Sequence, residues 1–538
     1  MAAKHDHALA SGSEESLAPA PAGNPVADSR ELELKLDLSA AALKAVAERL
    51  AGHENASRRR AVSLVSGYFD TEQQDLHKAG VTLRIRRQGR KRTQTLKHGE
   101  RGLGLFDRLE IERRATGDAP TFTDEESEAL GRLMNAPPSA DQLAPVFTTT
   151  VKRTVFDVAH GETIIEIALD AASIEVDEHR VEFCELELEL RAGAAAELFG
   201  VARELLDVAP LRVSVQAKSS RGYALLQNGE PRAFKAQGSP IRRGMTVEQA
   251  FLAVAADCVT QFRRNEDLLL AQPTRSAIHR ARVALRRLRS GFAIFRPAIA
   301  DDRAPVLVSE LKWLAGALGA ARDLDVLIKK QETVAEASDE AASALPERLL
   351  ASRAKAYGDA LDALQSRRAL DLMLDLTEWA AVGRWRSDPQ TAAARETKIE
   401  DFAVEVLDRR LGRLLKRSRG LVKLAPEKRH EARLEAKKMR YAGDFFGALY
   451  DGGRCGKRYE RFMKRLVGLQ DQLGELNDIA TAQTLTYGIA QDAGAARDGS
   501  SAFAAGVLAG RAESRTAEVV GKAKIRRAKL NKAKPFWR

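Results

Sequence analysis

The sequence predicts a multidomain α+β protein in which an antiparallel β domain with flanking helices is followed by an all-α domain. In the first half, segments such as ELELKLDL from residue 31 and FCELELEL from residue 183 alternate charged and apolar residues. This alternation is typical of strands with one polar face. Beyond about residue 244, long segments rich in Ala, Leu and Arg show helical periodicity instead, and one helical motif occurs twice.

The charge of the chain divides at the same place. Residues 1–228 hold 29 Lys and Arg against 36 Asp and Glu, whereas the remaining residues hold 57 against 39. The second half is therefore expected to meet a polyanion such as nucleic acid, polyphosphate or an anionic membrane surface. No apolar run approaches the roughly 18 residues of a membrane span. Three scattered cysteines fit a reducing cytoplasm.

Composition also predicts the domain boundaries. Residues 1–28 lack the basic and apolar regions of a signal peptide and are expected to form a disordered tail. The β domain should span residues 29–227, and the Gly- and Pro-containing residues 228–243 should form a linker. The helical domain is expected over 244–520, as repeats of about 244–395 and 396–520. A basic tail over 521–538 should either add electrostatic grip or be disordered.

The strands of the first half share a charged face. Helical segments are expected near residues 40–51 and 194–206, with strand-like segments before, between and after them. The strand-like segments start near residues 31, 63, 81, 93, 106, 146, 163 and 183, and the VSVQAKSS segment follows the second helix. If they form one sheet, a single face collects Glu31, Glu33, Glu110, Glu112, Glu166, Asp170, Glu185, Glu187 and Glu189 with Lys35, Arg84, Arg86, Lys97, Arg153 and Lys218.

Such a face calls for bound ions. Carboxylates stacked at short distance repel by about 1 kcal/mol or more per pair unless cations lie between them. Oxygen ligands without His or Cys suit Mg²⁺ or Mn²⁺, and the interspersed Arg and Lys suit phosphate oxygens. A concave or closed sheet that holds metal and polyphosphate explains both sets, whereas a solvated, self-paired charged face is the plainer alternative.

These residues together resemble the CYTH family, also called the triphosphate tunnel metalloenzymes. The resemblance rests on motifs that keep their order over residues 29–227: Glu31-x-Glu33-x-Lys35, LRIRR, Lys97, R-x-E-x-E from Arg108, the acids near Asp170, ELELE and KSSRGY from Lys218. It implies an antiparallel β-tunnel of about eight strands with charged side chains inside. Basic residues would cradle a triphosphate there, and carboxylates would hold divalent metal.

The resemblance also implies roles for individual residues. Glu31, Glu33 and two of Glu185, Glu187 and Glu189 look like metal ligands, with Glu110, Glu112 and Asp170 as further metal or water partners. The implied phosphate cradle, taken as the catalytic set, consists of Lys35, Arg84, Arg86, Lys97, Arg153 and Lys218. Which pair among the three alternating glutamates coordinates the metal stays open.

The second half contains an internal repeat. HRARVALRRLRSGF from His279 and HEARLEAKKMRYAG from His430 align without gaps at a separation of 151 residues. The alignment pairs His279 with His430, Arg282 with Arg433, Arg286 with Lys437, Arg287 with Lys438 and Arg289 with Arg440. At 100° per residue, positions 279, 282, 286 and 289 fall within about 80° of arc. A basic stripe is usually a solvated face, but its occurrence in two copies favours an anion site.

The repeat resembles the CHAD family of conserved-histidine α-helical domains, which often follow a CYTH domain. The motifs are H-x-x-R-V-x-x-R-R-L-R and the later L-G-x-x-R-D-x-D-V, which contains Arg322. The resemblance covers about residues 244–520 and implies two pseudo-symmetric helical bundles that bind inorganic polyphosphate. The second copy departs from it at Asn477 and Ala480, so whether both halves bind equally stays open.

These observations predict a cytoplasmic, divalent-metal-dependent hydrolase that converts inorganic triphosphate to pyrophosphate and phosphate, with a polyphosphate-binding helical module. Association with polyphosphate granules is left open. One alternative is a thiamine triphosphatase or a class IV adenylyl cyclase on the same tunnel, although no aromatic residue near the cradle indicates a pocket for a base or thiazole ring. The other is a non-catalytic scaffold for polyphosphate or nucleic acid.

Overall fold

The computed structural model describes residues 31–99, 103–226, 232–236, 238–335, 344–495, 510 and 514–538. Within these ranges the side chains of residues 31, 107–109, 330–335, 344–346, 477 and 480–495 are not described. The N-terminal tail predicted over residues 1–28, the side chain of Glu31, and the departures at Asn477 and Ala480 therefore lie outside the described part.

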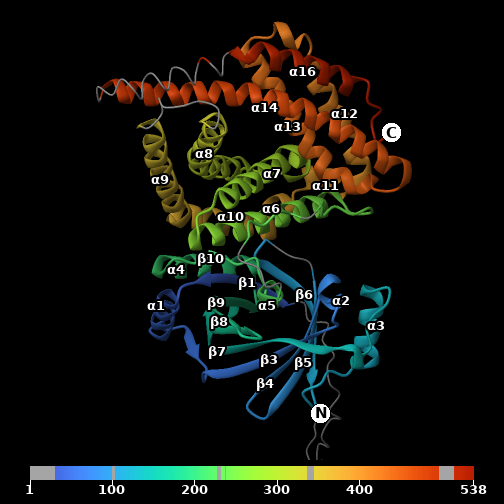
Figure 1. The fold of residues 1–538 in the computed structure, drawn as a ribbon. Helices are drawn as coiled ribbons and strands as arrows, with labels where there is room; N and C mark the ends of the chain where they lie inside the picture. Colours follow the sequence, from blue (N-terminus) through green and yellow to red (C-terminus); the bar gives the residue numbers. More distant parts are fainter. Residues whose placement is uncertain are drawn as a thin grey trace, which may run out of the picture.

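Ten strands make one antiparallel sheet in the first domain (Figure 1). They are β1 Glu31–Leu38, β2 Ala56–Arg58, β3 Val62–Asp70, β4 Val81–Gln88, β5 Lys91–His98, β6 Leu105–Arg114, β7 Ala144–His160, β8 Thr163–Val176, β9 His179–Ala192 and β10 Arg212–Val213. Eight of them pair in the order β1, β6, β5, β4, β3, β7, β8, β9, and β9 pairs back with β1. This curled sheet confirms the predicted antiparallel arrangement of about eight strands.

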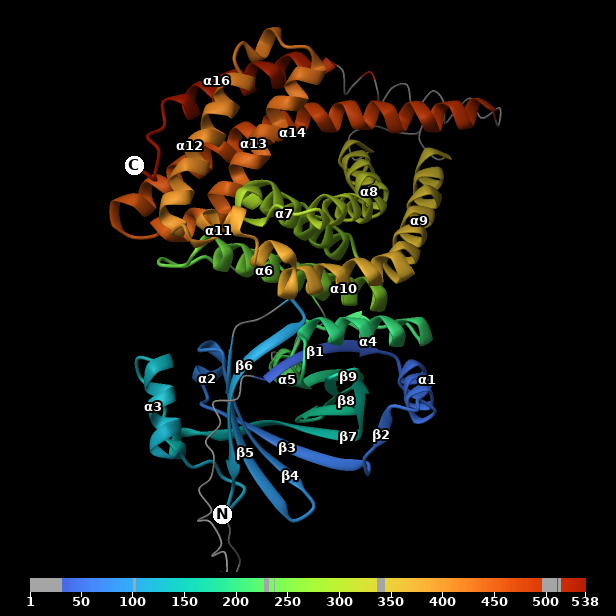
Figure 2. The ribbon, with the colours of Figure 1, turned by 180° about the vertical axis from the view of Figure 1, so that it is seen from behind.

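The outer face of the sheet is apolar and is covered by helices. These helices are α1 Ala40–Ala51, α2 Asp75–Lys78, α3 Asp124–Leu133 and α4 Ala195–Val208, whereas α5 Lys218–Leu226 lies within the curve of the sheet (Figures 1 and 2). Leu34 and Leu36 of β1 belong to the same core as Val46 of α1 and Leu198 of α4. On the wall made by β4 and β5, Leu83 and its neighbours pack with residues of α2 and α3. Because side chains alternate along a strand, the charged residues of the same strands point to the inner face.

The second domain contains helices α6 to α14 and α16 in its described part. They are α6 Val247–Ala271, α7 Arg275–Ile299, α8 Arg303–Ala335, α9 Ala344–Gln365, α10 Arg367–Val382, α11 Pro389–Glu396, α12 Ile399–Arg417, α13 Pro426–Phe446, α14 Gly453–Ala495 and α16 Thr516–Asn531. Their starts are often capped; for example, Thr246 accepts from the backbone of Gln249 (3.2 Å). No helix in the described ranges is both long enough and apolar enough to cross a membrane.

The repeated motif occupies α7 and α13. The helices that open the two repeats begin side by side, because the backbone N–H of Val247 donates to Thr397 O and that of Ile399 donates to Met245 O, each over 3.0 Å. The two donors, Val247 and Ile399, are 152 residues apart, as are the two acceptors, Met245 and Thr397, and this offset is close to that of the repeated motif. The symmetric contact supports two copies of one helical unit.

The C-terminal residues are part of the helical domain, so the expected alternative of a disordered tail is wrong. Residues 516–531 form α16, whose Arg527 Nη2 donates to the carbonyl of Leu415 on α12 (3.0 Å). Phe536 and Trp537 are buried, and Trp537 Nε1 donates to Asp408 on α12 (2.8 Å). The two aromatic side chains bury enough apolar surface to order a segment whose net charge alone favoured disorder.

The two domains share one hydrophobic core. Figures 1 and 2 show α6 and α10 lying across the end of the β domain that carries β1 and α4. Buried side chains of β1 and α4 form one continuous cluster with those of α6, α8 and α10. The helical domain is therefore packed against the β domain rather than tethered to it by the segment around residues 232–243.

Candidate functional site

The inner face of β1 is charged and buried. Glu33, Lys35 and Asp37 are 6%, 6% and 8% exposed, although they are polar. The register opposes them to the acids of β9, with Lys35 facing Glu187 and Asp37 facing Glu185. The Glu-x-Glu pattern therefore points into the curled sheet rather than to solvent, so a plain solvated face is wrong for these residues.

A cluster of three carboxylates lies at the centre of this interior. Oxygen atoms of Asp170, Glu185 and Glu187 lie within 4.8 Å of one another, and all three side chains are buried. They come together because β8 pairs with β9 so that Asp170 faces Glu185, and Glu187 lies two residues further along the same face. Among the described residues, this trio could hold a metal ion.

Three basic side chains surround the acid cluster, defined here as Asp170, Glu185 and Glu187. Lys218 Nζ lies 2.9, 2.6 and 2.7 Å from oxygens of Asp170, Glu185 and Glu187, respectively. Arg153 donates to both oxygens of Asp170 (2.7 and 2.6 Å) and also pairs with Glu187. Lys35 pairs with Glu187 and lies 2.6 Å from Glu33. The charge of the cluster is thus offset by basic side chains from three elements, β1, β7 and α5.

The two glutamates of the cluster have pKa values shifted in opposite directions. Burial raises the pKa of Glu185 to about 7 against the opposing pull of Lys218 and Lys35. Burial acts in the same direction on Glu187, but Lys218, Lys35 and Arg153 outweigh it and hold the pKa of Glu187 well below its usual range. One oxygen of Glu185, Oε2, is buried without a hydrogen-bond partner in the described part of the chain. That oxygen is suited to a cation ligand.

An arginine wall lies on β4. Arg84 and Arg86 face inward, and the Nε of each is buried without a hydrogen-bond partner among the described groups. Burial, followed by the charges of Arg84 and Arg153, lowers the pKa of Arg86 to about 10. Lys97 on β5 lies 2.7 Å from Glu110 on β6. Crowded guanidinium groups with unused donors are the arrangement expected of an anion site.

The predicted acids do not all gather at one place. Glu189 pairs with Arg191, and Glu166 is bonded by Arg59 (2.7 Å) and Arg191 (2.9 Å). Glu112 is exposed and accepts a 3.4 Å bond from Thr95. The structure thus brings Glu185 and Glu187 together with Asp170 and leaves Glu189 with an arginine partner.

Lys218 reaches the cluster from a helix, not from a strand of the sheet face as expected. It is the first residue of α5, which Figures 1 and 2 show within the curve of the strands. Tyr223 on α5 donates to the buried Asp70 (2.7 Å), which also accepts from the backbone N–H groups of Leu76 and His77. Helix formation follows from the loss of strand partners after β10, which leaves the KSSRGYALL segment to satisfy its own backbone groups.

Aromatic residues lie closer to the cradle than the sequence indicated. Tyr68 is paired with Arg84 across β3 and β4, and its ring stacks on Phe147 with 4.5 Å between centroids. Phe147 in turn meets Tyr223 edge to face at 5.2 Å. The sequence pattern did not indicate these aromatic neighbours, since alternation alone does not show which strands lie side by side. All three rings are buried against one another where α5 packs on β3 and β7.

The two basic stripes of the helical domain face each other. Helices α7 and α13, which carry the stripes, are in contact. Burial lowers the pKa of Arg433 on α13, and the charge of Arg286 on α7 adds to this effect. For Lys437, burial and then Arg433 and Arg286 lower the pKa to about 7. The Nε atoms of Arg282, Arg286 and Arg433 are buried without a hydrogen-bond partner in the described part. We call the group formed by Arg282, Arg286, Arg433 and Lys437 the basic cleft.

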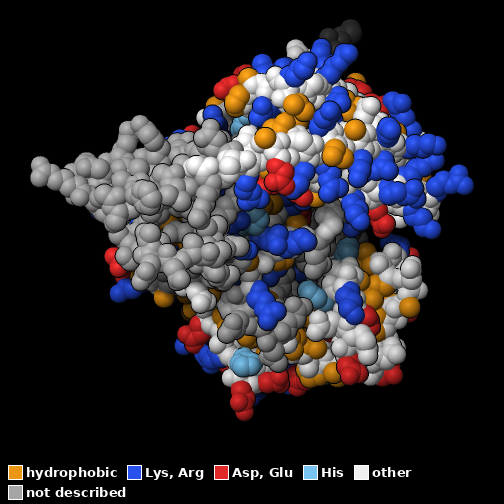
Figure 3. All heavy atoms as spheres, turned by 45° about the horizontal axis from the view of Figure 1, so that its top comes forward, with side chains coloured by type: hydrophobic (Ala, Val, Ile, Leu, Met, Phe, Trp, Pro, Cys, Tyr) orange, Lys and Arg blue, Asp and Glu red, His pale blue; other side chains and the backbone are white. Residues whose placement is uncertain are grey.

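Residues from α7 and α8 extend this cleft. Burial, followed by the charges of Arg322, Arg286, Arg280 and Arg282, lowers the pKa of His279 to about 4, so its ring is neutral at physiological pH. Arg282 is the partly neutralised member, since it donates to Asp323 (3.1 Å) and to Gly319 O (3.2 Å). His430, the counterpart of His279, is exposed whereas His279 is half-buried. Figure 3 shows further Lys and Arg side chains gathered on the surface of the helical domain.

Several predicted members of the stripes are engaged elsewhere. Arg287 donates to Asp257 (2.9 Å) and Gln261 (3.0 Å) on α6, and Lys438 pairs with Glu435 (2.7 Å). Arg440 lies 3.7 Å from Asp444, and Arg289 is half-buried with an Nε that has no hydrogen-bond partner among the residues described. Arg287 and Lys438 point away from the stripes because each follows a stripe residue directly, and successive residues of a helix are rotated by about 100° around its axis.

Sequence reasoning missed two inward-facing residues of the first domain. Asp37 continues the alternation of Glu33 and Lys35, so the same pattern could have identified it. It accepts a 2.6 Å bond from Arg221 of α5. Tyr68 had no comparable signal, because its place beside Arg84 is decided by strand pairing.

Comparison with known proteins identifies two domain families in the chain. A CYTH domain model matches residues 29–223, and a CHAD domain model matches residues 253–486. The chain is a CYTH domain followed by a CHAD domain. The chain is similar to an inorganic triphosphatase from Haemophilus influenzae, with 30% identity over 202 residues that cover 36% of this chain and 55% of that protein. The chain thus spans about half the length of this curated relative.

Two solved structures are among those to which the chain is similar. The crystal structure of a CHAD domain from Ricinus communis has 26% sequence identity and a TM-score of 0.48, and it covers 56% of this chain and 98% of its own. A second structure is of a Hippeastrum protein that is named as a putative adenylyl cyclase and described as having a dominant triphosphatase activity. It has 18% sequence identity and a TM-score of 0.29, and the match covers 37% of this chain and 96% of the Hippeastrum chain.

Proposed function

We propose that the CYTH domain hydrolyses inorganic triphosphate to pyrophosphate and orthophosphate with the help of a divalent cation. The observation that carries this proposal is the buried acid cluster, which lies in the same tunnel as Arg84 and Arg86, whose Nε atoms have no hydrogen-bond partner in the described ranges. In a complex of triphosphate with a divalent cation, the carboxylates could bind the cation and the arginines could bind the phosphate groups. The similarity to an inorganic triphosphatase supports the choice of substrate.

The acid cluster fits a hard divalent cation. Its donors are all carboxylate oxygens, and Glu185 Oε2 is buried without a partner in the described structure. Mg²⁺ and Mn²⁺ prefer such ligands. When bound, the cation would neutralise charge on the bridging phosphate oxygens. Lys35 and Lys218, which now neutralise the carboxylates, would then be available to the substrate.

The chain's own residues supply binding and orientation. Arg84, Arg86 and Arg153 hold the phosphate oxygens with their guanidinium donors, and Lys97 extends the cradle toward Glu110. The carboxylates orient the water that attacks the terminal phosphorus. The P–O bond to the bridging oxygen breaks, and pyrophosphate leaves. This reaction is chiefly a matter of positioning and charge stabilisation, so it needs no covalent nucleophile.

A turnover panel tests the proposal. Triphosphate, thiamine triphosphate and ATP are compared with Mg²⁺, Mn²⁺ or a chelator, with release of phosphate and pyrophosphate measured. We expect triphosphate to have the highest kcat/KM and the chelator to abolish turnover. A thiamine triphosphatase or a nucleotide cyclase on the same tunnel would reverse the order of substrates, and a non-catalytic scaffold would turn over none of them.

We also propose that the basic cleft binds inorganic polyphosphate. The cleft brings stripes from both repeats together, so one anionic chain can contact α7 and α13 at the same time. The test compares Arg286→Ala with Lys438→Ala, because Lys438 is paired with Glu435 outside the cleft. We expect Arg286→Ala to weaken binding of long-chain polyphosphate about tenfold or more and Lys438→Ala to leave it within twofold. Competition by RNA at fixed salt measures selectivity.

A further inference from the structure

A buried arginine of the CHAD domain reaches the inner face of the tunnel. Arg263 on α6 is 1% exposed. Its Nε donates to the carbonyl of Val213 on β10 (2.8 Å), and its Nη2 lies 3.9 Å from Asp37 Oδ2 on β1. On its own helix, Arg263 also pairs with Glu266 and lies 3.4 Å from Asp267. One guanidinium group therefore contacts two strands of the neighbouring domain.

Asp37 connects this arginine to α5. Its Oδ1 accepts a 2.6 Å bond from Arg221, which lies one helical turn after Lys218. Lys218 contacts all three carboxylates of the acid cluster. The chain of contacts runs from α6 through Asp37 and Arg221 to the helix that carries Lys218. A displacement of the Arg263 side chain would therefore change the position of Lys218 at the acid cluster.

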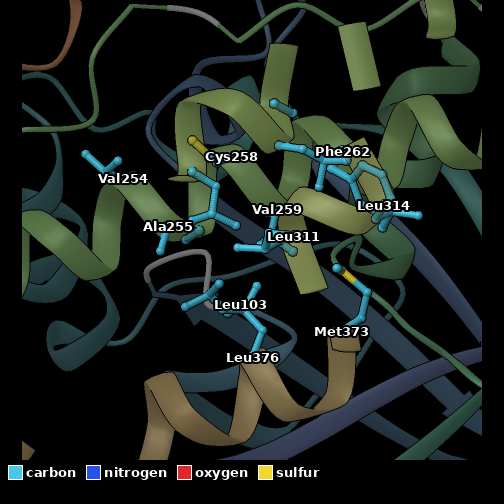
Figure 4. Packing of buried hydrophobic residues seen from close by; sticks show 14 of the residues in the cluster. Leu103, Val254, Ala255, Cys258, Val259, Phe262, Leu311, Leu314, Met373 and Leu376 are labelled. Carbon is cyan, nitrogen blue, oxygen red and sulfur yellow. The ribbon is translucent and has the colours of Figure 1, made fainter. Parts of the chain in front are cut away.

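A second contact holds the backbone of β1 from the same side. Leu103 lies among side chains of α6, α8 and α10, as Figure 4 shows, and its carbonyl accepts a 2.7 Å bond from Thr377 of α10. The next carbonyl, of Gly104, accepts from the N–H of Lys35 (3.2 Å). The helical domain therefore clamps the segment that holds Lys35 in place.

Arg263 is an unusual residue for its surroundings. Its helix neighbours Val259 and Phe262 are buried in the core shared by the two domains. Burying a guanidinium group is costly, and an apolar side chain would pack in such a place without that cost. Glu266 on the same helix balances the charge, and the remaining donors of the guanidinium group contact Asp37 and the carbonyl of Val213 across the domain boundary.

We propose that Arg263 is a positioning residue of the tunnel site, which holds α5 and its Lys218 at the acid cluster through Asp37 and Arg221. The CHAD domain then completes the triphosphate site in addition to binding polyphosphate. The inference deepens the proposed hydrolysis of triphosphate and rests on it.

The test compares two interdomain arginines in the full chain. Arg263→Met removes the contact with Asp37. Arg203→Met is the matched control, because Arg203 on α4 joins Asp375 and Glu378 on α10 (2.6 Å each) away from the inner face. We expect Arg263→Met to lower kcat/KM for triphosphate at least tenfold, mainly through KM, and Arg203→Met to change it less than twofold. Arg263→Lys should recover part of the loss.

A double-mutant cycle shows whether the effect passes through Asp37. Asp37→Asn should raise KM as much as Arg263→Met does, and the double variant should be no worse than either single variant. Additive losses, or equal kinetics for Arg263→Met and Arg203→Met, would overturn the inference. If Arg263→Met does not fold, Arg221→Met replaces it, with the same KM rise expected and wild-type kinetics overturning the inference. Absence of triphosphatase activity in the wild-type protein would instead overturn the proposed function.

Discussion

At the scale of single residues, the buried carboxylates of the tunnel repel one another and need basic neighbours to offset this repulsion. Two like charges about 4 Å apart repel by about 4 kcal/mol at an effective dielectric constant of 20. The acid cluster brings three carboxylates within 4.8 Å, and Lys35, Arg153 and Lys218 offset that repulsion. The arrangement keeps the carboxylates ready for a cation and the basic groups ready for phosphate.

Glu187 has the most cationic partners in the cluster, so its replacement should be the most damaging. Glu187→Gln keeps the shape of the side chain but leaves Lys35, Arg153 and Lys218 with a neutral neighbour. We expect kcat/KM for triphosphate to fall at least 100-fold, together with the affinity for Mn²⁺. Steady-state kinetics and Mn²⁺ titration measure this. The exposed Glu182 on the same strand is the control, and near wild-type activity of a folded Glu187→Gln variant would contradict the assignment.

Lys437 should make polyphosphate binding depend on pH. Its pKa is lowered to about 7 by burial and then by Arg433 and Arg286. A bound polyanion favours the charged form, so binding takes up a proton once the pH exceeds 7. Affinity should therefore be constant below pH 6 and fall as pH rises above 7, by up to about tenfold per unit.

Titration calorimetry or fluorescence anisotropy between pH 5.5 and 8.5 measures this dependence. Lys437→Arg keeps the charge at every pH and should remove most of the slope. A His430→Gln background removes the exposed imidazole of the same stripe. An unchanged slope in the Lys437→Arg variant would show that another group is responsible.

At the scale of elements, α5 is the part that turns a curled sheet into a closed site. It places Lys218 at the acid cluster, and its Tyr223 joins the aromatic group of Tyr68 and Phe147. Close approach to the sheet depends on Gly222, because an added Cβ would lie 2.3 Å from the ring of Phe147. The small size of Gly222, rather than a long apolar face, therefore allows α5 to pack closely on the sheet.

Gly222→Ala should push α5 away from the sheet. We expect a loss of about 1–3 kcal/mol in the free energy of unfolding and a rise in KM for triphosphate, because Lys218 moves with the helix. Chemical denaturation and kinetics measure the two effects. Gly131→Ala on α3 is the control, since no atom lies within 4 Å of its added Cβ, and it should be neutral or slightly stabilising. A stable, fully active Gly222→Ala variant would contradict this role for α5.

At the scale of the whole molecule, the two domains are one folding unit in the sense that their cores are continuous. Leu34 and Leu36 of β1 pack in the same cluster as Val254 of α6 and Leu376 of α10. Ion pairs at the rim, such as Arg367 with Asp207, surround this apolar centre. Removal of one domain would expose the large apolar surface of the other to water.

A fragment of residues 29–226 should therefore behave differently from the full chain. We expect it to aggregate or to unfold at lower temperature, and to lose most triphosphatase activity, because roughly 25 cal/mol is lost for each Å² of apolar surface left exposed. Size-exclusion chromatography and thermal unfolding measure this. Co-expression with residues 232–538 should restore activity. A monomeric fragment with full activity would show that the CHAD domain is dispensable for the tunnel.

Much of the tunnel could be predicted from local pattern. The alternation in β1 and β9 identified Glu33, Lys35, Glu185 and Glu187 as inward-facing, because side-chain direction in a strand has a period of two. The stripe of His279, Arg282 and Arg286 followed in the same way from helical periodicity. Arg287 and Lys438 were included because adjacent basic residues look equivalent in a sequence, although the helix turns them toward other partners.

The order of the two domains, the inner and outer faces of the strands, and the existence of two basic helices can all be derived from the amino-acid sequence, since each depends on residues close together in the chain. The tertiary structure decided that Asp170, Glu185 and Glu187 form one cluster and that Lys218 reaches it from a helix. It also decided that the stripes of α7 and α13 face each other and that Arg263 reaches Asp37. These contacts join residues far apart in sequence, and only the packing of one shared core sets the distances between them.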